Sequence, residues 1–326
     1  MKYKKILITG ANGFLGTNVV RSFSSRGVET RVLVRRSNAT LDTTEGCEVL
    51  FGSVMSLEDM SRAAEGCDAI VHICAITDQS LLRYRDYRDF NVGSLEVAVS
   101  AARAASISRL VFVSSANTVG NGTSAIDLGD ESTPLSGVYR RQFYGRSKVE
   151  AESFLLSQGD LERVIVNPCF MLGAYDRGPS SGELVIRGYR RRLVMSTPGG
   201  KNVVDVEYAA EALCNAVEMG ANGERYLLAG ENISYRDFYT LLGEVDGVKK
   251  RYFATPLWIL LIGGYIGDFI RFLGIRTRLS SLNARAVSMS EHYTGAKAEK
   301  ALLLKRTDTK AAIQKAVTWF ESEGFF

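Results

Sequence analysis

A glycine-rich turn near the N-terminus constrains the fold of this chain more than any other feature. Gly10, Gly13 and Gly16 recur at intervals of three within residues 9–16. The turn follows the apolar run 5–8, which is typical of a strand, and it precedes hydrophobic residues at helical spacing. Three glycines at such a junction allow a tight turn, a close approach of the backbone to a pyrophosphate and close packing of helix on sheet. Because a helix N-terminus also offers free N–H groups to an anion, the turn predicts a bound nucleotide cofactor.

Short strand-like runs then alternate with helical patterns along most of the chain. Further strands are expected at residues 29–34, 48–51, 69–73, 110–113, 163–168, 202–206 and 224–228. Helices are expected at residues 14–23, 56–64, 91–105 and 207–218, and from about residue 142 onward. This alternation predicts an α/β fold with a doubly wound parallel sheet of the Rossmann type.

Two changes in regularity predict a smaller, discontinuous C-terminal lobe. The chain becomes irregular after the sixth expected strand, and it becomes helical but less regular from residue 231 onward. We therefore expect residues 1–168 and 202–230 to form the nucleotide-binding domain. Residues 169–201 and 231–326 would form a substrate-binding lobe at the carboxyl ends of the strands, where open α/β sheets bind ligands.

The end of the second expected strand predicts which dinucleotide is bound. An acidic residue about 20 positions beyond the glycines would hold the ribose 2′-hydroxyl of NAD, whereas an arginine accommodates the 2′-phosphate of NADP. Arg35 stands 19 residues after Gly16 and is followed by Arg36 and Ser37. A solvated arginine at a strand end is the ordinary alternative, but it would not explain the missing acid. We expect NADP, with NAD as the alternative, and a phosphate contact from Arg35 supported by Arg36 and Ser37.

The composition argues against several other classes of protein. A net charge of +4 from 40 basic and 36 acidic residues predicts neither nucleic-acid binding nor attraction to a membrane surface. His72 and His292 are the only histidines and lie far apart in sequence, which argues against a zinc site or a Ser-His-Asp triad. Five scattered cysteines without a Cys-x-x-Cys pair suit reduced thiols. No apolar signal region follows the basic N-terminal residues, so we expect a cytoplasmic protein.

A tyrosine and a lysine follow the fifth expected strand. Tyr144 and Lys148 are four residues apart in the helix that begins near Gln142, so they share one helix face. The strand 110–113 ends in the serine pair 114–115, about 30 positions earlier. Alone, the Tyr-Lys pair could be a surface tyrosine packed on a lysine stem. Its place after this strand favours a catalytic role.

These features together resemble the short-chain dehydrogenase/reductase superfamily in its extended form, the NAD(P)-dependent epimerase/dehydratase family. The residues that carry the resemblance are Gly10, Gly13, Gly16, Ser115, Tyr144, Lys148, 166–168 and 204–206. Within the superfamily, residues 34–35, 166–168 and 226–230 look most similar to the dihydroflavonol-reductase-like and 3β-hydroxysteroid-dehydrogenase-like branch.

The resemblance implies an oxidoreductase with a Ser-Tyr-Lys site. Tyr144 would give a proton to a substrate carbonyl oxygen, and Ser115 would hydrogen-bond the same oxygen. Lys148 would lower the pKa of Tyr144 toward the working range and bind the nicotinamide ribose. Further cofactor contacts are implied for Asn12, Phe14, Leu15, Ala75, Asn167 and Pro168. The implied substrate is a small-molecule ketone, aldehyde or alcohol, and the implied assembly is a homodimer.

Departures from the family pattern narrow this prediction. Many relatives carry an acidic residue that contacts adenine where this chain has 52–54, Gly-Ser-Val. Sugar-nucleotide dehydratases carry an acidic pair directly after the active-site hydroxyl, whereas Ala-Asn at 116–117 follows Ser115, which argues against dehydration. A nucleotide-sugar epimerase remains the main alternative: Arg35 argues against it, and the basic cluster 187–192 argues for it. A non-catalytic NADP-sensing protein is a third alternative, and it is less favoured because such a protein would not need an intact Ser-Tyr-Lys set.

An apolar segment at residues 256–267 is open to more than one interpretation. It runs for about a dozen residues before Asp268 interrupts it, which is short of the roughly 18 to 20 residues that a membrane span needs. We expect a helix packed inside the second lobe. A contact with one membrane leaflet and an apolar wall for the substrate are the alternatives.

Overall fold

The computed structural model describes residues 2–36, 41, 44–135 and 137–326. Its centre is a seven-stranded parallel sheet in the order β10-β6-β5-β4-β1-β2-β3. The strands are β1 (Lys5–Thr9), β2 (Glu29–Val34), β3 (Cys47–Phe51), β4 (Ala69–His72), β5 (Arg109–Val113), β6 (Glu162–Pro168) and β10 (Arg225–Leu228). The strand order reverses between β1 and β4, which is where sheets of this kind bind ligands. The expected doubly wound Rossmann-type sheet is therefore confirmed.

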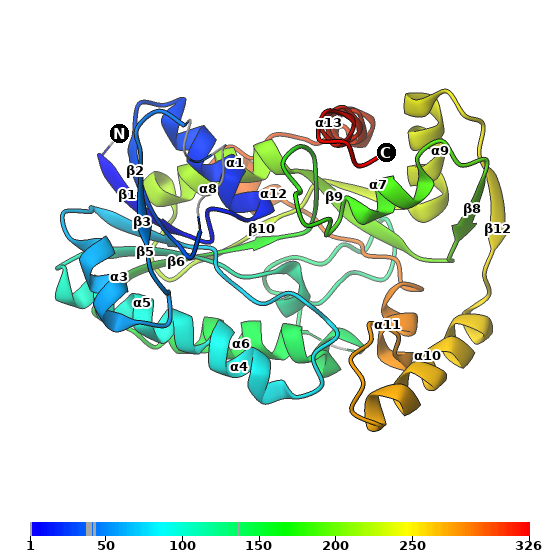
Figure 1. Cartoon of the computed structure of the whole chain (residues 1–326), viewed down its shortest axis with the longest axis horizontal. Helices are drawn as coiled ribbons and strands as arrows, with labels where there is room; N and C mark the ends of the chain where they lie inside the picture. Colours follow the sequence, from blue (N-terminus) through cyan, green and yellow to red (C-terminus); the bar gives the residue numbers. More distant parts are fainter. Residues whose placement is uncertain (1, 37–40, 42–43, 136) are drawn as a thin grey trace.

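Helices cover both faces of this sheet, as Figure 1 shows. One face carries α1 (Phe14–Ser24), α8 (Val206–Met219) and α12 (Ala296–Leu302). The opposite face carries α3 (Leu57–Ala64), α4 (Tyr84–Asn91), α5 (Gly93–Ala104) and α6 (Phe143–Leu156). Successive residues of a strand point to opposite faces, so Ile6 and Ile8 enter one hydrophobic core and Leu7 enters the other. The central strands are mostly apolar because both faces are buried.

The remaining elements lie beyond one end of the sheet (Figure 1). Two small sheets contain β7 (Phe170–Leu172), β9 (Gly200–Asp205) and β11 (Glu231–Ser234) in one, and β8 (Leu193–Ser196) and β12 (Arg251–Ala254) in the other. The helices are α7 (Glu183–Gly188), α9 (Tyr235–Asp246), α10 (Leu257–Phe272), α11 (Ser281–Ala286) and α13 (Thr309–Ser322). Residues from α7, α9 and α13 form a third hydrophobic core. A second packed body thus faces the carboxyl ends of the main strands.

The course of the chain after β6 is more interwoven than periodicity indicates. β9 pairs with β7 and β11 rather than with the main sheet, although α8, which follows it directly, packs against α1. The late helix α12 also returns to the main domain and packs on α8. The division into two lobes at residues 168, 202 and 230 remains a proposal.

The position of α10 differs from the sequence-based expectation. Only Gly264 and Gly267 of this helix are buried, while Trp258 and Phe269 are each 63% exposed. The glycines face the protein because a Cβ atom at Gly264 would lie 2.7 Å from the Cα atom of Ser281. The prediction of a buried helix is therefore wrong. Within the described residues, none of the helices has both the length and the apolar character to cross a membrane.

Arg109 ties the start of β5 to the end of α8. Its side chain is 6% exposed and pairs with Glu162 at 2.9 Å. The guanidinium also donates to the main-chain carbonyl of Ala216 at 2.9 Å and to that of Gly220. A buried carbonyl that loses its donor destabilises the folded state, so this contact holds the sheet and helix together.

We expect Arg109→Met to lower the free energy of unfolding by about 2 to 3 kcal/mol, because the Gly220 carbonyl loses its donor and Glu162 its partner. Arg103 is a matched control, since it pairs with Asp160 at 2.8 Å on the surface. Arg103→Met should cost no more than about 1 kcal/mol. Urea denaturation of both variants tests this, and equal losses would contradict the assignment.

Candidate active site

The glycine turn joins β1 to α1 in a backbone conformation that needs glycine. Gly10 has a φ of +74°, and a Cβ atom there would lie 2.8 Å from the amide nitrogen of Cys74 at the end of β4. A Cβ atom at Gly16 would lie 2.1 Å from the carbonyl oxygen of Gly10. Gly13 precedes the first residue of α1 and has no side-chain cap. The helix N-terminus therefore lies open beside a tightly packed turn, which fits a dinucleotide pyrophosphate.

A cavity of about 810 Å³ extends from this turn to the ends of β5 and β6. Its wall includes the predicted residues Gly10, Asn12, Gly13, Phe14, Leu15, Gly16, Ala75, Ser115, Tyr144, Lys148 and Pro168. Residues that are far apart in sequence thus share one space. Arg35, Arg36 and Asn167 are not on this wall, and Ser37 lies outside the described residues.

Arg35 and Arg36 are exposed at the end of β2, next to the glycine turn. The Asn12 side chain donates to the main-chain carbonyl of Arg36 and so joins the turn to this strand end. Burial raises the pKa of the Cys74 thiol, and the charges of Lys148 and Arg35 oppose that rise. Cys74 lines the cavity, whereas Arg35 lies outside its wall.

A carboxylate lies at the end of β3 even though residues 52–54, which follow the strand, supply none. Asp59 of α3 accepts a hydrogen bond from the Ser53 amide at 2.9 Å. Gly52 lies so close that a Cβ atom there would be 2.7 Å from the Asp59 carboxyl carbon. Sequence reasoning saw only the missing acid at residues 52–54, because this carboxylate comes from a different element.

Tyr144 and Lys148 project from α6 into the cavity, but Lys148 does not contribute to the pKa shift of Tyr144. Withdrawal of the phenol from water raises the pKa of Tyr144 to about 12, and a hydrogen bond with Ser115 opposes the rise. The Lys148 ammonium instead donates to the Val113 carbonyl at 2.8 Å and lies 4.6 Å from the centre of the Phe112 ring. Lys148 is not among the causes of the pKa shift of Tyr144 in this structure, and its effect on that pKa stays a prediction.

The resulting protonation states define what the site can do. With a pKa of about 12, Tyr144 is a neutral phenol at neutral pH, which is the form that can donate a proton to a carbonyl oxygen. Burial lowers the pKa of Lys148 to about 8, and the Glu152 carboxylate opposes that shift. Lys148 therefore keeps its charge at neutral pH but sits close to its titration range.

A buried polar network stands behind Ser115. The Asn167 amide nitrogen lies 3.2 Å from the Ser115 carbonyl, 2.9 Å from the Thr118 hydroxyl and 2.7 Å from the Glu152 carboxylate. Thr118 also donates to Glu152 at 2.7 Å, and Arg225 pairs with the other carboxylate oxygen. Asn167 thus connects β6, the turn after β5 and α6. Sequence reasoning missed Thr118 and Glu152, although Glu152 follows Lys148 at a spacing of four on the same helix.

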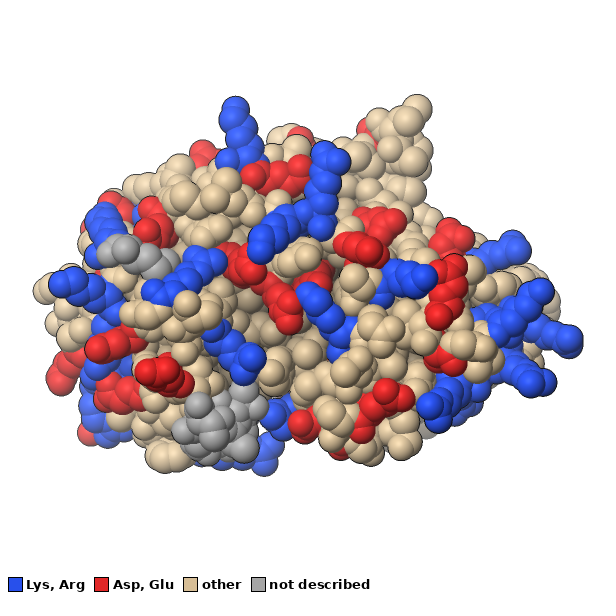
Figure 2. All heavy atoms as spheres, turned by 90° about the horizontal axis from the view of Figure 1, so that it is seen from above, with Lys and Arg blue, Asp and Glu red and all other residues tan. Residues whose placement is uncertain are grey.

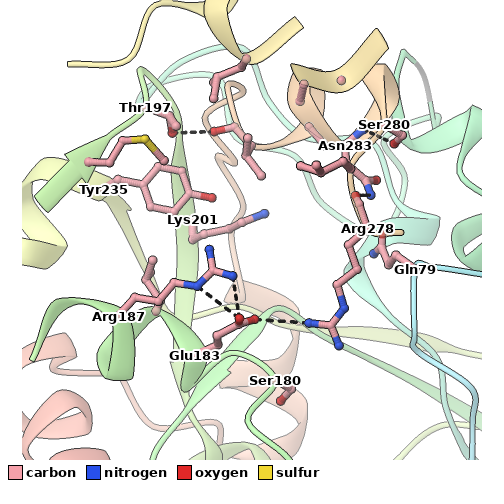
Figure 3. A pocket seen from close by; sticks show the side chains of 18 of the residues that line it. Gln79, Ser180, Glu183, Arg187, Thr197, Lys201, Tyr235, Arg278, Ser280 and Asn283 are labelled. Carbon is pink, nitrogen blue, oxygen red and sulfur yellow. Dashed lines mark hydrogen bonds and ion pairs between the residues drawn. The ribbon is translucent and has the colours of Figure 1, made fainter. Parts of the chain in front are cut away.

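A second cavity of about 870 Å³ adjoins the first and shares Gln79, Ser180 and Arg278 with it. Figure 3 shows Glu183 between two guanidinium groups, and the oxygens of Glu183 lie 2.6 Å from Arg187 and 3.4 Å from Arg278. Lys201 and Tyr235 also line this cavity.

The basic cluster at residues 187–192 contributes only partly to this cavity. Arg187 and Arg191 belong to its wall, whereas Arg190 lies 3.7 Å from Glu321 at the surface. The second cavity is therefore a mixed polar and apolar space next to the Ser-Tyr-Lys residues, as a substrate site would be.

Comparison with known proteins agrees with this geometry. Residues 6–229 match the model of the NAD dependent epimerase/dehydratase family, and the chain belongs to that family. A Synechocystis protein named after dihydroflavonol 4-reductase is 29% identical over 98% of this chain and 95% of its own length. Sterol demethylase protein B of Methylococcus capsulatus is 27% identical over 98% of both chains. A Stigmatella aurantiaca ketoreductase of a farnesylated dihydroquinoline oxide is 29% identical over 81% of this chain and 80% of its own.

Solved structures show the same fold. The crystal structure of gox2253 covers 99% of both chains with a TM-score of 0.84 and 26% identity. UDP-glucose 4-epimerase of Bifidobacterium longum, in complex with NAD+ and UDP, has a TM-score of 0.75 at 17% identity and covers 98% of this chain and 99% of its own. RMD of Pseudomonas aeruginosa, complexed with NADPH, has a TM-score of 0.74 at 15% identity with the same coverage. This chain is thus an NAD(P)-dependent oxidoreductase or epimerase of the family.

We expect cofactor binding to depend on pH, because burial lowers the pKa of Lys148 to about 8. As pH rises through about 8, the free protein loses the ammonium that would contact the cofactor, so the Kd for NADPH should rise between pH 7 and pH 9.5. Fluorescence titration measures this directly. In Lys148→Met the Kd should be higher and nearly constant over the same range. A wild-type Kd that does not change with pH would contradict a contact between the Lys148 ammonium and the cofactor.

Proposed function

We propose that this protein transfers hydride between NADP(H) and a small organic substrate, reducing a ketone or aldehyde or oxidising the corresponding alcohol. The observation that supports this most directly is the single cavity that contains both the glycine turn and the residues Ser115, Tyr144 and Lys148. A nicotinamide bound there would supply the hydride to the carbonyl carbon.

The protein's own residues would donate the proton and stabilise the developing negative charge. Tyr144 donates its phenolic proton to the carbonyl oxygen, and the product alcohol then carries one hydride and one proton. Ser115 donates a hydrogen bond to the same oxygen and so stabilises the developing alkoxide. Lys148 places its ammonium near the ribose, while Asn167 and Glu152 keep the Ser115 turn and α6 in position.

The preference for NADP rests on Arg35. Asn12, on the cavity wall, joins the glycine turn to the strand end where Arg35 and Arg36 stand. A guanidinium binds a phosphate with two parallel hydrogen bonds, which a ribose hydroxyl does not require. We keep Arg35, with Arg36 and Ser37, as the proposed contact to the 2′-phosphate.

A nucleotide-sugar epimerase is the second candidate. Arg187, Arg191, Lys201 and Arg278 line the cavity beside the catalytic residues and could meet a diphosphate. Glu183 already pairs with two of them, however, which leaves less positive charge for such a ligand. The Stigmatella relative is a ketoreductase by name, which favours carbonyl reduction.

A cytoplasmic homodimer remains part of the proposal.

We expect Tyr144→Phe to reduce kcat by about 10² to 10⁴, because it removes the proton donor. Binding of NADPH should stay close to that of the wild-type protein, since the glycine turn and Arg35 are unchanged. Ser115→Ala should lower kcat by about 10² or more, also without loss of cofactor binding. Steady-state kinetics with a panel of ketones, aldehydes and sugar nucleotides, beside NADPH titration, measures both quantities. Wild-type turnover in Tyr144→Phe would refute the mechanism.

Replacement of Arg35 by Asp should weaken NADPH binding by about 10-fold or more, which corresponds to a charge-assisted contact of roughly 1.5 to 3 kcal/mol. NADH binding should be equal or better, because the carboxylate can accept from the ribose hydroxyl. Arg31→Leu, farther back on β2 and paired with Glu48, is the control and should leave the preference unchanged. An unaltered ratio of the two Kd values in Arg35→Asp would rule out this contact.

A further inference from the structure

The outward face of α10 carries large apolar side chains. Trp258, Ile262, Tyr265, Phe269 and Phe272 recur at intervals of three or four and are each more than half exposed. This spacing places them on one side of the helix, and we call them the apolar stripe. A soluble helix normally turns such a side toward its core. A continuous exposed surface of this kind is typical of a site that binds something else.

The two charged residues of α10 point away from the stripe. Asp268 accepts from the Ser281 amide at 3.2 Å. Arg271 donates to the carbonyls of Leu81 and Thr277, both at 2.8 Å. Because both charges are used inside the protein, the outward side of the helix presents no charge of its own.

Exposed basic residues lie near the stripe. From residue 247 to residue 290 the chain carries seven Lys or Arg residues and one acidic residue, Asp268. Of the seven, Lys250 is buried in an ion pair with Asp246, and Arg278 pairs with Asp78 and Glu183. Arg251, Arg276, Arg278 and Arg285 are exposed. Figure 2 shows Lys and Arg gathered at the right-hand edge of the molecule, the end at which Figure 1 places β8 and β12. The exposed Arg276 follows α10, and the exposed Arg285 donates to the hydroxyl of Tyr265 at 3.4 Å. An apolar stripe with arginines at its end and edge is complementary to an anionic lipid surface.

The strands that lead into α10 extend the apolar surface. β12 ends two residues before α10 and pairs in parallel with β8. Phe253 of β12 and Met195 of β8 are partners in the register, and both are more than half exposed. Leu193 of β8 is exposed as well. Leu193 and Met195 also belong to the wall of the second cavity, so exposed apolar side chains are found beside that cavity as well as on α10.

We propose that α10 docks this protein on the surface of an anionic lipid membrane. Its 16 residues extend about 24 Å, less than the roughly 30 Å of the hydrocarbon core, so the helix lies along the membrane rather than through it. Trp258 and Tyr265 are residue types that favour the membrane interface. Leu260 and Gly264 of the same helix line the second cavity, so docking places that cavity beside the lipid. The proposal does not depend on hydride transfer.

Sedimentation with lipid vesicles tests the docking. The full-length protein should bind vesicles of phosphatidylcholine with phosphatidylglycerol, and binding should fall at least about 10-fold without phosphatidylglycerol or in high salt. The double variant Phe269→Glu, Phe272→Glu should lose binding by a similar factor, because it puts charge on the stripe. Ile126→Glu is the matched control, since Ile126 is 97% exposed elsewhere on the surface, and it should bind normally. Melting curves show that each variant is folded.

Fluorescence provides a second readout, because the chain has two tryptophans and only Trp258 is exposed. Vesicles should shift its emission to the blue, and Trp258→Phe should lose this shift. Failure of the wild-type protein to bind anionic vesicles, or normal binding by the double variant, overturns the proposal. A dimer that Phe269→Glu dissociates, without lipid binding, would show that a second copy covers the stripe. Tyr144→Phe should bind vesicles normally, so failure of the mechanism is distinguishable from failure of docking.

Discussion

The parallel register of β1, β4, β5 and β6 is the constraint on which the site depends. Thr9 of β1 pairs with His72 of β4, and Val113 of β5 pairs with Val166 of β6. The segments that follow these residues therefore leave the sheet at the same edge. The glycine turn, the serine pair 114–115 and the wall residues that follow β4 and β6 are these segments. A slip of one residue in any strand would turn its side chains to the opposite face and separate them.

Burial at this edge sets the protonation states of Tyr144 and Lys148, the proposed catalytic groups. It raises the pKa of Tyr144 to about 12 and lowers that of Lys148 to about 8. A lysine with a lowered pKa in the folded state destabilises that state while it is charged. This cost is present in full below pH 8 and is relieved as pH rises from about 8 toward the unfolded value of 10.5. A buried charge that lowers stability is typical of a functional position.

The substrate side of the molecule is built from segments that are distant in sequence. Gln79 follows β4, Ser180 precedes α7 and Arg278 follows α10, yet the three residues lie between the two cavities. The helix that contributes Leu260 to this wall presents its opposite side to the surroundings. The same helix therefore contributes both to the wall of the cavity and to the exposed apolar surface.

The sequence by itself determined the features that depend on local spacing. The glycine turn between strand and helix, the alternation that makes a doubly wound sheet, and the shared helix face of Tyr144 and Lys148 follow from residues that are close in the chain. Only the tertiary structure decided the pKa of Tyr144, the carboxylate that Asp59 brings to the end of β3, and the outward side of α10. The physical reason is that solvation, long-range hydrogen bonds and helix orientation depend on neighbours that distant parts of the chain supply.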